Sequence, residues 1–393
     1  MANIKQLIGE VEDIISGEEN QRRIDVQRRL NRLETVQPTP FNSFSFSGIF
    51  PIVVNAWSKR LKLPIDIELT GKNTGAINPD YAANLIHFQL LQKIEAFKAS
   101  NDDIPLSSHI STNLGLCWLY RDSPVGEHYR TVPETGAFIA EPILKTEADF
   151  EKLEVPRYEF DEQLHKQRIA VFEEMLDGRL LVSDDALPPG IGAPFQTANN
   201  LRGVQQILED FILQPHLVHR VMEFLSQAIV SYVGEMVQLR GGNTGTPSVF
   251  GCAGVFGCDE VSCDMFPPSY YDEFIYPYEC RAAAVYDTIY YHSCANITPL
   301  IEKILTVPNM RRIHVSPWSD LKTAIEVTGK QVILEKWLDP NLKLDELSPD
   351  EMRTCVRKVT DCGVDFPLDM RVETNTRGGR LFREIFYEEI SAA

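Results

Sequence analysis

Short hydrophobic runs alternate with helix-like stretches through the second half of this 393-residue chain. The runs are rich in β-branched and aromatic residues, which favour strands, and segments with helical periodicity follow them. Strands are predicted at 287–294, 312–317, 331–335 and 364–369. Strands and helices that alternate with a pitch of roughly 20–30 residues are typical of parallel βαβ units. We therefore expect an α/β fold with a parallel sheet.

Polar residues stand where each of these predicted strands ends. They are His292 and Cys294, Ser316 and Ser319, Glu335 and Lys336, and Asp369 and Arg371. In an α/β barrel the carboxyl ends of the strands form the catalytic mouth. If the sheet closes into such a barrel, these side chains surround the active site.

The first half of the chain is less regular but compatible with the same fold. Residues 180–185 predict a buried strand, and a loop rich in proline and glycine follows it. Pro215 opens a strongly amphipathic helix. Residues 1–60 predict helices and an arm packed outside a barrel that spans 61–393, and no change of composition calls for a second domain.

Composition and charge limit the kinds of partner. The net charge of −18 would repel nucleic acid and anionic membrane surfaces, so a small molecule or a protein with a complementary patch is expected. No apolar run approaches the ~20 residues that a bilayer-spanning helix needs. The amino terminus lacks the pattern of a secretory signal, so we expect a cytoplasmic protein.

Cysteine spacing gives no disulfide framework in a chain of this length. Cys252, Cys258 and Cys263 lie close together, but their spacing fits no common zinc or iron–sulfur pattern. Such cysteines most simply fill space near a strand. Asp259, within this cluster, could reach the barrel mouth and act in catalysis.

The sharpest chemical signal is the pair His292-x-Cys294. Residues i and i+2 of a strand point to the same side, so both side chains can reach one point. An imidazole and a thiolate that converge suit Zn²⁺, which takes nitrogen and sulfur ligands. The alternative is that His292 lines a pocket and Cys294 is a buried thiol.

Other residues could act at the same mouth. Asp185 could position substrate or serve as a general acid or base, or it could cap a helix or loop. Glu335 could be a metal ligand or a base, or it could pair with Lys336. Candidates for substrate binding are His109, Tyr291, Trp318 and Arg371, although His109 could be structural and the two aromatic residues could belong to the core.

Five segments in the second part of the chain form an ordered pattern: residues 141–156, 192–203, 266–277, 292–294 and 337–340. Together they cover roughly residues 130–375, and in order and spacing they resemble the uroporphyrinogen decarboxylase superfamily. That superfamily also includes zinc-dependent methyltransferases that move a methyl group from a corrinoid to coenzyme M. The resemblance implies a single (β/α)8 TIM barrel with extra amino-terminal helices. It also implies that the barrel could form a homodimer.

In the methyltransferase branch, a zinc ion held by a His-x-Cys pair and a later cysteine binds the acceptor thiol and lowers its pKa. By strand register, Asp369 corresponds to that cysteine here, and Cys362 is the alternative third ligand. The resemblance thus implies a zinc-dependent methyltransferase that moves a methyl group between a corrinoid, carried by a partner protein, and a thiol or other acceptor.

One departure weighs against the decarboxylase of tetrapyrrole metabolism. Genuine uroporphyrinogen decarboxylases carry an arginine-rich motif near the amino terminus. The corresponding residues here, 42–46 and 53–57, lack it. Burying the carboxylates of a tetrapyrrole without cations is costly. Two alternatives stay open: a metal-free lyase in which Asp185 and Asp259 steer protonation, and a non-catalytic barrel that holds a small ligand or corrinoid.

Overall fold

Eight short parallel strands build the centre of the molecule in a computed structural model of the chain. It describes residues 4–42, 79–112, 118–121, 129–131, 138–140, 142–153, 157–160, 162–183, 193–239, 252, 254–339, 341–372 and 376–392. Six strands form one sheet in the order β1 (Phe41–Asn42), β12 (Leu368–Arg371), β11 (Ile333–Trp337), β10 (Met310–Val315), β9 (Ile289–Tyr291) and β8 (Gly254–Phe256). The other two, β2 (His109–Ser111) and β7 (Leu181–Ser183), pair with each other.

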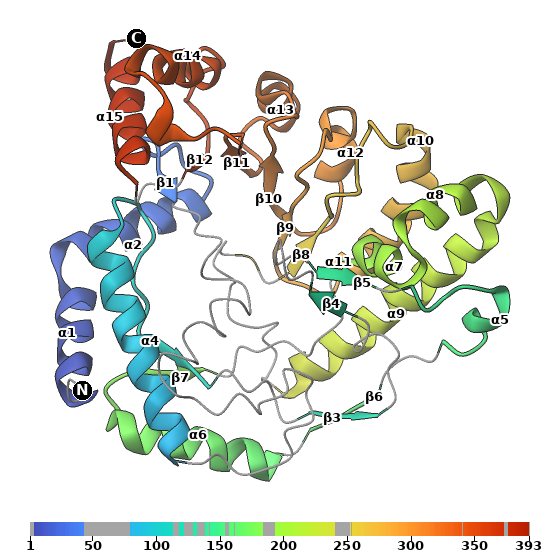
Figure 1. Cartoon of the computed structure of the whole chain (residues 1–393), viewed down its shortest axis with the longest axis horizontal. Coiled ribbons are helices and arrows are strands. Elements are labelled where there is room, and N and C mark those ends of the chain that lie inside the picture. Colours follow the sequence, from blue (N-terminus) through green and yellow to red (C-terminus); the bar gives the residue numbers. More distant parts are fainter. Residues whose placement is uncertain are drawn as a thin grey trace.

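This strand order is that of a (β/α)8 barrel, as predicted. Strands β8 to β12 are neighbours in chain order, and the first strand, β1, lies in parallel beside the last, β12. Helices surround the strands on the outside (Figure 1). Within the described residues no ladder joins β1 to β2 or β7 to β8, so the recorded pairing does not close the ring.

Helices precede the first strand, connect the others and follow the last one. They are α1 (Ile4–Ser16), α2 (Glu18–Asn31), α4 (Pro79–Ala99), α5 (Glu147–Phe150), α6 (Glu162–Leu176), α7 (Pro194–Arg202), α8 (Val204–Leu213), α9 (Pro215–Leu239), α10 (Pro268–Tyr270), α11 (Tyr276–Ala283), α12 (Ile301–Leu305), α13 (Leu321–Thr328), α14 (Pro349–Thr360) and α15 (Arg377–Ala392). A π-helical segment, η2 (Tyr271–Ile275), joins α10 to α11, and 3-10 turns η3 (Thr298–Leu300) and η4 (Leu344–Glu346) precede α12 and α14. Two antiparallel pairs stand apart: β3 (Trp118–Arg121) with β6 (Arg157–Phe160), and β4 (Tyr129–Thr131) with β5 (Phe138–Ala140).

Local sequence signals explain where several elements begin. Ser348 caps α14 and exchanges hydrogen bonds with Glu351, which satisfies amide groups that the first helical turn leaves free. The side chain of Asp320 accepts from the amide of Thr323 at the start of α13. The four strands predicted in the second half are confirmed as β9 to β12, and the amphipathic helix that opens at Pro215 is confirmed as α9.

The amino-terminal segment contributes to the barrel itself. Helices α1 and α2 lie outside the strands, as expected, but β1 at Phe41–Asn42 pairs with β12. Asn42 donates a hydrogen bond to the Asp369 carboxylate on that strand. The first strand of the parallel sheet therefore lies at Phe41–Asn42.

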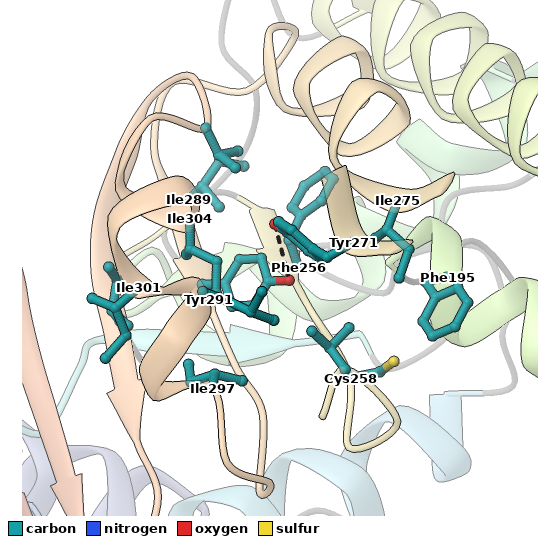
Figure 2. Close-up of a cluster of buried hydrophobic side chains, with 14 of the residues drawn as sticks. Phe195, Phe256, Cys258, Tyr271, Ile275, Ile289, Tyr291, Ile297, Ile301 and Ile304 are labelled. Atoms are coloured by element: carbon teal, nitrogen blue, oxygen red, sulfur yellow. Dashed lines mark hydrogen bonds between the residues drawn. The ribbon is translucent and has the colours of Figure 1, made fainter. Parts of the chain in front are cut away.

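Two main hydrophobic clusters pack the helices onto the strands, besides a minor one in which Leu30 and Val36 meet Ile333 of β11. The larger one lies between β8 to β12 and the helices of the second half, and the smaller one packs α1, α4 and α6 around β2 and β7. Figure 2 shows part of the larger cluster, in which the Tyr291 and Tyr271 rings meet among isoleucine side chains. No helix that the structure describes has both the length and the apolar composition needed to span a bilayer.

Candidate metal centre

Three side chains that can bind a metal converge at the carboxyl ends of β9 and β10. One ligand atom from each of His292, Cys294 and His314 lies within 4.8 Å of the other two. Cys294 Sγ is 3.3 Å from His292 Nε2, and the two imidazole rings stack with their centroids 4.5 Å apart. Cys294 is exposed whereas His314 is buried, so the cluster opens to solvent on one side. The prediction that His292 and Cys294 converge is confirmed.

The surroundings of His292 fix which of its nitrogens carries the proton. Tyr290 Oη lies 2.7 Å from Glu335 Oε1, to which it donates, and 3.0 Å from His292 Nδ1. Because the hydroxyl proton goes to the carboxylate, the hydroxyl oxygen accepts from Nδ1–H of His292. The lone pair of His292 is then on Nε2, the atom that faces Cys294. Metal-binding histidines are often held in one orientation by a hydrogen bond from the second ring nitrogen toward a carboxylate.

His314 is suited to metal binding by its lack of other partners. It is completely buried, and neither ring nitrogen has a hydrogen-bond partner within the described residues. Burial and the neighbouring His292 imidazole hold its pKa well below the usual value, so the ring is neutral. A buried polar group without a partner is costly, and a cation held at the edges of the two rings and by the thiol would give one His314 nitrogen a partner. The donor set of two nitrogens and one sulfur fits Zn²⁺.

Asp259 lies at the edge of this cluster. Its carboxylate accepts a hydrogen bond from the Cys294 amide at 3.1 Å and stands 3.8 Å from His292 Nε2. Burial, together with this carboxylate, raises the pKa of the Cys294 thiol to about 12. Asp259 therefore faces the site, where we expected it, and keeps Cys294 protonated when no cation is present.

Gly257 brings the β8 end close to the metal-binding strand. Its φ of +76° is in the left-handed region, and a Cβ there would lie 2.4 Å from the His292 carbonyl oxygen. The amide of His292 also donates to Phe256. Only glycine permits this close approach of the two chain segments.

Asp369 does not join the cluster in which we expected it. Its buried carboxylate forms an ion pair with Arg312, which also contacts Glu335 at 3.2 Å. Arg371 pairs with Glu335 at 3.1 Å. The four groups form a neutral, buried ion network, because two carboxylates face two guanidinium groups. His314 takes the third position that sequence analysis gave to Asp369, and Cys362 lies elsewhere, after α14.

Glu335 acts on the cluster only from a distance. Burial alone would raise its pKa, but Arg371 and Arg312 outweigh that effect and lower it, so the group is ionised. Besides Tyr290 it accepts a hydrogen bond from Trp337 Nε1 at 2.7 Å. Glu335 is thus neither a ligand in the cluster nor paired with Lys336, whose ammonium points to the other side of β11, toward Ser316.

The remaining predicted residues are spread over the fold. Tyr291 is completely buried and bonds to Tyr271 and Glu279 in the core, so it is not a pocket wall (Figure 2). His109 is the first residue of β2, at the end of that strand away from the mouth. Trp318 is 49% exposed and lines a pocket beside α13. Arg371 is enclosed in the ion network, and Asp185 lies outside the described residues.

Sequence analysis missed His314 and Tyr290. Both follow from the alternation of side chains along a strand. Tyr290 shares the face of His292, whereas Tyr291 faces the opposite side. In Arg312-Ile-His-Val-Ser316, polar residues alternate with apolar ones, which indicates that Arg312 and His314 both point into the barrel.

Comparison with known proteins decides the family. The uroporphyrinogen decarboxylase (URO-D) family model matches residues 113–367, which is well over half of the chain. The chain belongs to the URO-D family. No curated protein was found to be similar in sequence. Among solved structures, a methyltransferase from Methanosarcina mazei is similar over 94% of this chain and 98% of its own, with 14% identity and a TM-score of 0.47.

The family match includes most of the segments whose sequence resembled this family. The match covers the Gly-Ala-Pro-Phe region at the start of α7, the segment that leads into α10, and both residues of the His-x-Cys pair. It also includes His314 and Glu335. The candidate metal centre therefore lies inside the URO-D domain of this chain, not in an addition to it.

Proposed function

We propose that this URO-D family member is a zinc-dependent methyltransferase that moves a methyl group between a corrinoid and a thiol or other acceptor. The observation that carries the proposal is the convergence of His292, Cys294 and His314, with ligand atoms within 4.8 Å of one another. Catalytic zinc sites typically have three protein ligands and leave one position open. The exposed position of Cys294 agrees with such an opening.

The residues around the cluster supply orientation and charge. His292 and His314 are neutral because burial lowers both pKa values, so each offers a lone pair. Tyr290 and Glu335 hold the His292 ring with Nε2 toward the site. A zinc ion bound there would lower the pKa of an acceptor thiol and so make it a better nucleophile.

The methyl donor in this proposal is a corrinoid carried by a separate protein. The acceptor is a small molecule that enters at the carboxyl ends of the strands, where Cys294 is exposed. Asp259 stands at the same edge, where its carboxylate orients the acceptor. We expect the reaction to take place in the cytoplasm.

A decarboxylase is the second candidate, because the matching family is named for that activity. The charges within the described residues argue against a tetrapyrrole substrate. Arg312 and Arg371, which point into the barrel, are already paired with Glu335 and Asp369. They are not available to bind the carboxylates of a porphyrinogen.

Metal content tests the proposal. The full chain, purified without oxygen, should hold about one zinc ion, and each of His292→Ala, Cys294→Ser and His314→Ala should lose it. Cys362→Ser is the matched control, since it removes a thiol outside the cluster and should keep the metal. The loaded chain should then demethylate methylcobalamin in the presence of a thiol.

Two results would contradict the proposal. A wild-type chain that takes up no zinc on titration has no metal centre of this kind. Zinc that stays bound in the His314→Ala chain but is lost from Cys362→Ser would place the site elsewhere.

A further inference from the structure

A pocket separate from the metal centre lies outside the barrel strands, between β11 and helix α14. It has a volume of about 460 Å³, in the range of pockets that hold small organic ligands. Residues 317–321 after β10, residues 336–339 and 342 at and after the end of β11, and one face of α14 line it. None of His292, Cys294 and His314 is among the lining residues, although Trp337 touches both the pocket and the two imidazole rings.

Lys336 is the unusual group in this pocket. Its side chain is only 9% exposed, and its Nζ donates one hydrogen bond, to the Ser316 carbonyl at 2.7 Å. It forms no ion pair with a carboxylate in the described parts of the chain. A lysine that is nine-tenths buried almost always has a charged partner. Here the amine is instead held by a backbone oxygen at the wall of a cavity.

Burial lowers the pKa of Lys336 to about 8. At pH 7.5 about a quarter of such a side chain is the free amine, compared with about 0.1% of an ordinary lysine. Lysines that are desolvated in this way act as nucleophiles toward carbonyl compounds. The other titratable groups that line the pocket are Asp320, Asp339, Cys355, Lys358 and Cys362.

The walls indicate the shape of a suitable ligand. Trp318 and Trp337 supply two indoles, and Leu338 and Leu342 add apolar surface. The carboxylate of Asp320 caps α13 and that of Asp339 accepts from the amide of Asn341, so both have hydrogen-bond partners within the protein. Flat, largely apolar molecules pack well on indole faces.

We propose that this pocket binds a small aromatic aldehyde or ketone and that Lys336 forms an imine with it. The amine lone pair attacks the carbonyl carbon, a C–N bond forms, and the carbonyl π electrons go to oxygen, which takes up a proton. The resulting carbinolamine loses water to give the C=N bond. No oxidant or reductant is needed. The hydrogen bond from Nζ to Ser316 keeps the amine oriented while its lone pair faces the cavity.

Reductive trapping tests this proposal on the full chain. Pyridoxal, an aromatic aldehyde, is added at pH 7.5, borohydride is used to reduce any imine, and peptide mass spectrometry locates the modified lysines. Lys336 should be modified at least tenfold faster than Lys358, an exposed lysine of α14 that lines the same pocket. The rate at Lys336 should rise with a midpoint near pH 8.

Two variants serve as controls. Lys336→Arg keeps the positive charge and the donor to Ser316 but cannot form an imine, and it should lose the fast label. Lys358→Arg should keep it. Equal labelling of Lys336 and the exposed lysines in the wild-type chain, or a Lys336 rate that rises only above pH 10, would overturn the proposal. The test needs no metal, so it succeeds or fails independently of the proposed methyltransferase activity.

Discussion

Replacement of Tyr290 by phenylalanine tests the link between the metal centre and the buried ion network. The change removes one hydroxyl, which lies 3.0 Å from His292 Nδ1 and 2.7 Å from Glu335 Oε1. The ring stays in place because the rest of the side chain is buried and unchanged. His292 then loses the acceptor that holds its proton on Nδ1, and the preference for an unprotonated Nε2 is lost.

The size of the effect follows from these contacts. Loss of an outer partner of a metal-binding histidine typically lowers metal affinity about 10- to 100-fold, which is about 1.4–2.7 kcal/mol of binding free energy. Glu335 keeps Trp337, Arg312 and Arg371 as partners, so its carboxylate remains satisfied. The free energy of unfolding without metal should therefore fall by only about 1–3 kcal/mol.

Zinc affinity is measured by competition with a chelator of known affinity, on wild-type and variant chains. Tyr291→Phe is the matched control. It removes the neighbouring hydroxyl, which contacts Tyr271 and Glu279 on the opposite face of β9. We expect Tyr291→Phe to lower the free energy of unfolding but to leave zinc affinity unchanged. Unchanged zinc affinity in Tyr290→Phe, or an equal loss in both variants, would refute the role given to Tyr290.

Three further predictions concern stability. Burial raises the pKa of Glu279 from 4.5 to about 7, so its favourable contribution to stability is complete below pH 4.5 and is lost as pH rises through 7. In urea unfolding the wild-type chain should lose about 3 kcal/mol of unfolding free energy between pH 4.5 and 8, and Glu279→Gln should retain it. A parallel decline in both chains would contradict this. Arg312→Leu leaves the buried carboxylates short of one cation and should lower the free energy of unfolding in urea by about 3–5 kcal/mol. Arg357→Leu, at an exposed ion pair, should lower it by less than about 1 kcal/mol. Equal losses in the two variants would show that the buried network contributes little. Gly257→Ala should lower the free energy of unfolding by about 1–3 kcal/mol through backbone strain. It should also weaken zinc binding, because the new methyl group displaces the His292 carbonyl. A thermal unfolding midpoint equal to that of wild type would rule out this clash.

The elements that were predictable from sequence are those specified locally. The cap at Ser348, the proline that opens α9 and the apolar runs of β9 to β12 all depend on residues a few positions apart. The pairing of His292 with Cys294 was predictable for the same reason, since side-chain alternation places i and i+2 on one face.

Contacts between strands were not predictable in this way. His314 meets His292 because β9 and β10 align with a register shift between Met310 and Arg312, which depends on packing of the two strands. Asp369 was assigned to the metal because strand register matches it to a cysteine of the methyltransferase branch, and its partner could not be known from sequence. Its partner, Arg312, lies on β10 and reaches it from two strands away.

The pairing of β1 with β12 has a consequence for how the protein is made. Asn42 and Asp369 are 327 residues apart in sequence, yet they bond directly. Arg383, on the last helix, also pairs with Asp103 beside β1. During synthesis β1 is made more than 300 residues before β12, so it has no partner strand while those residues are added. Contacts of such long range form slowly, because a large loop must be closed first. This part of the sheet therefore assembles only after β12 has been made, and until then the unpaired edge of β1 is open to pairing with other chains.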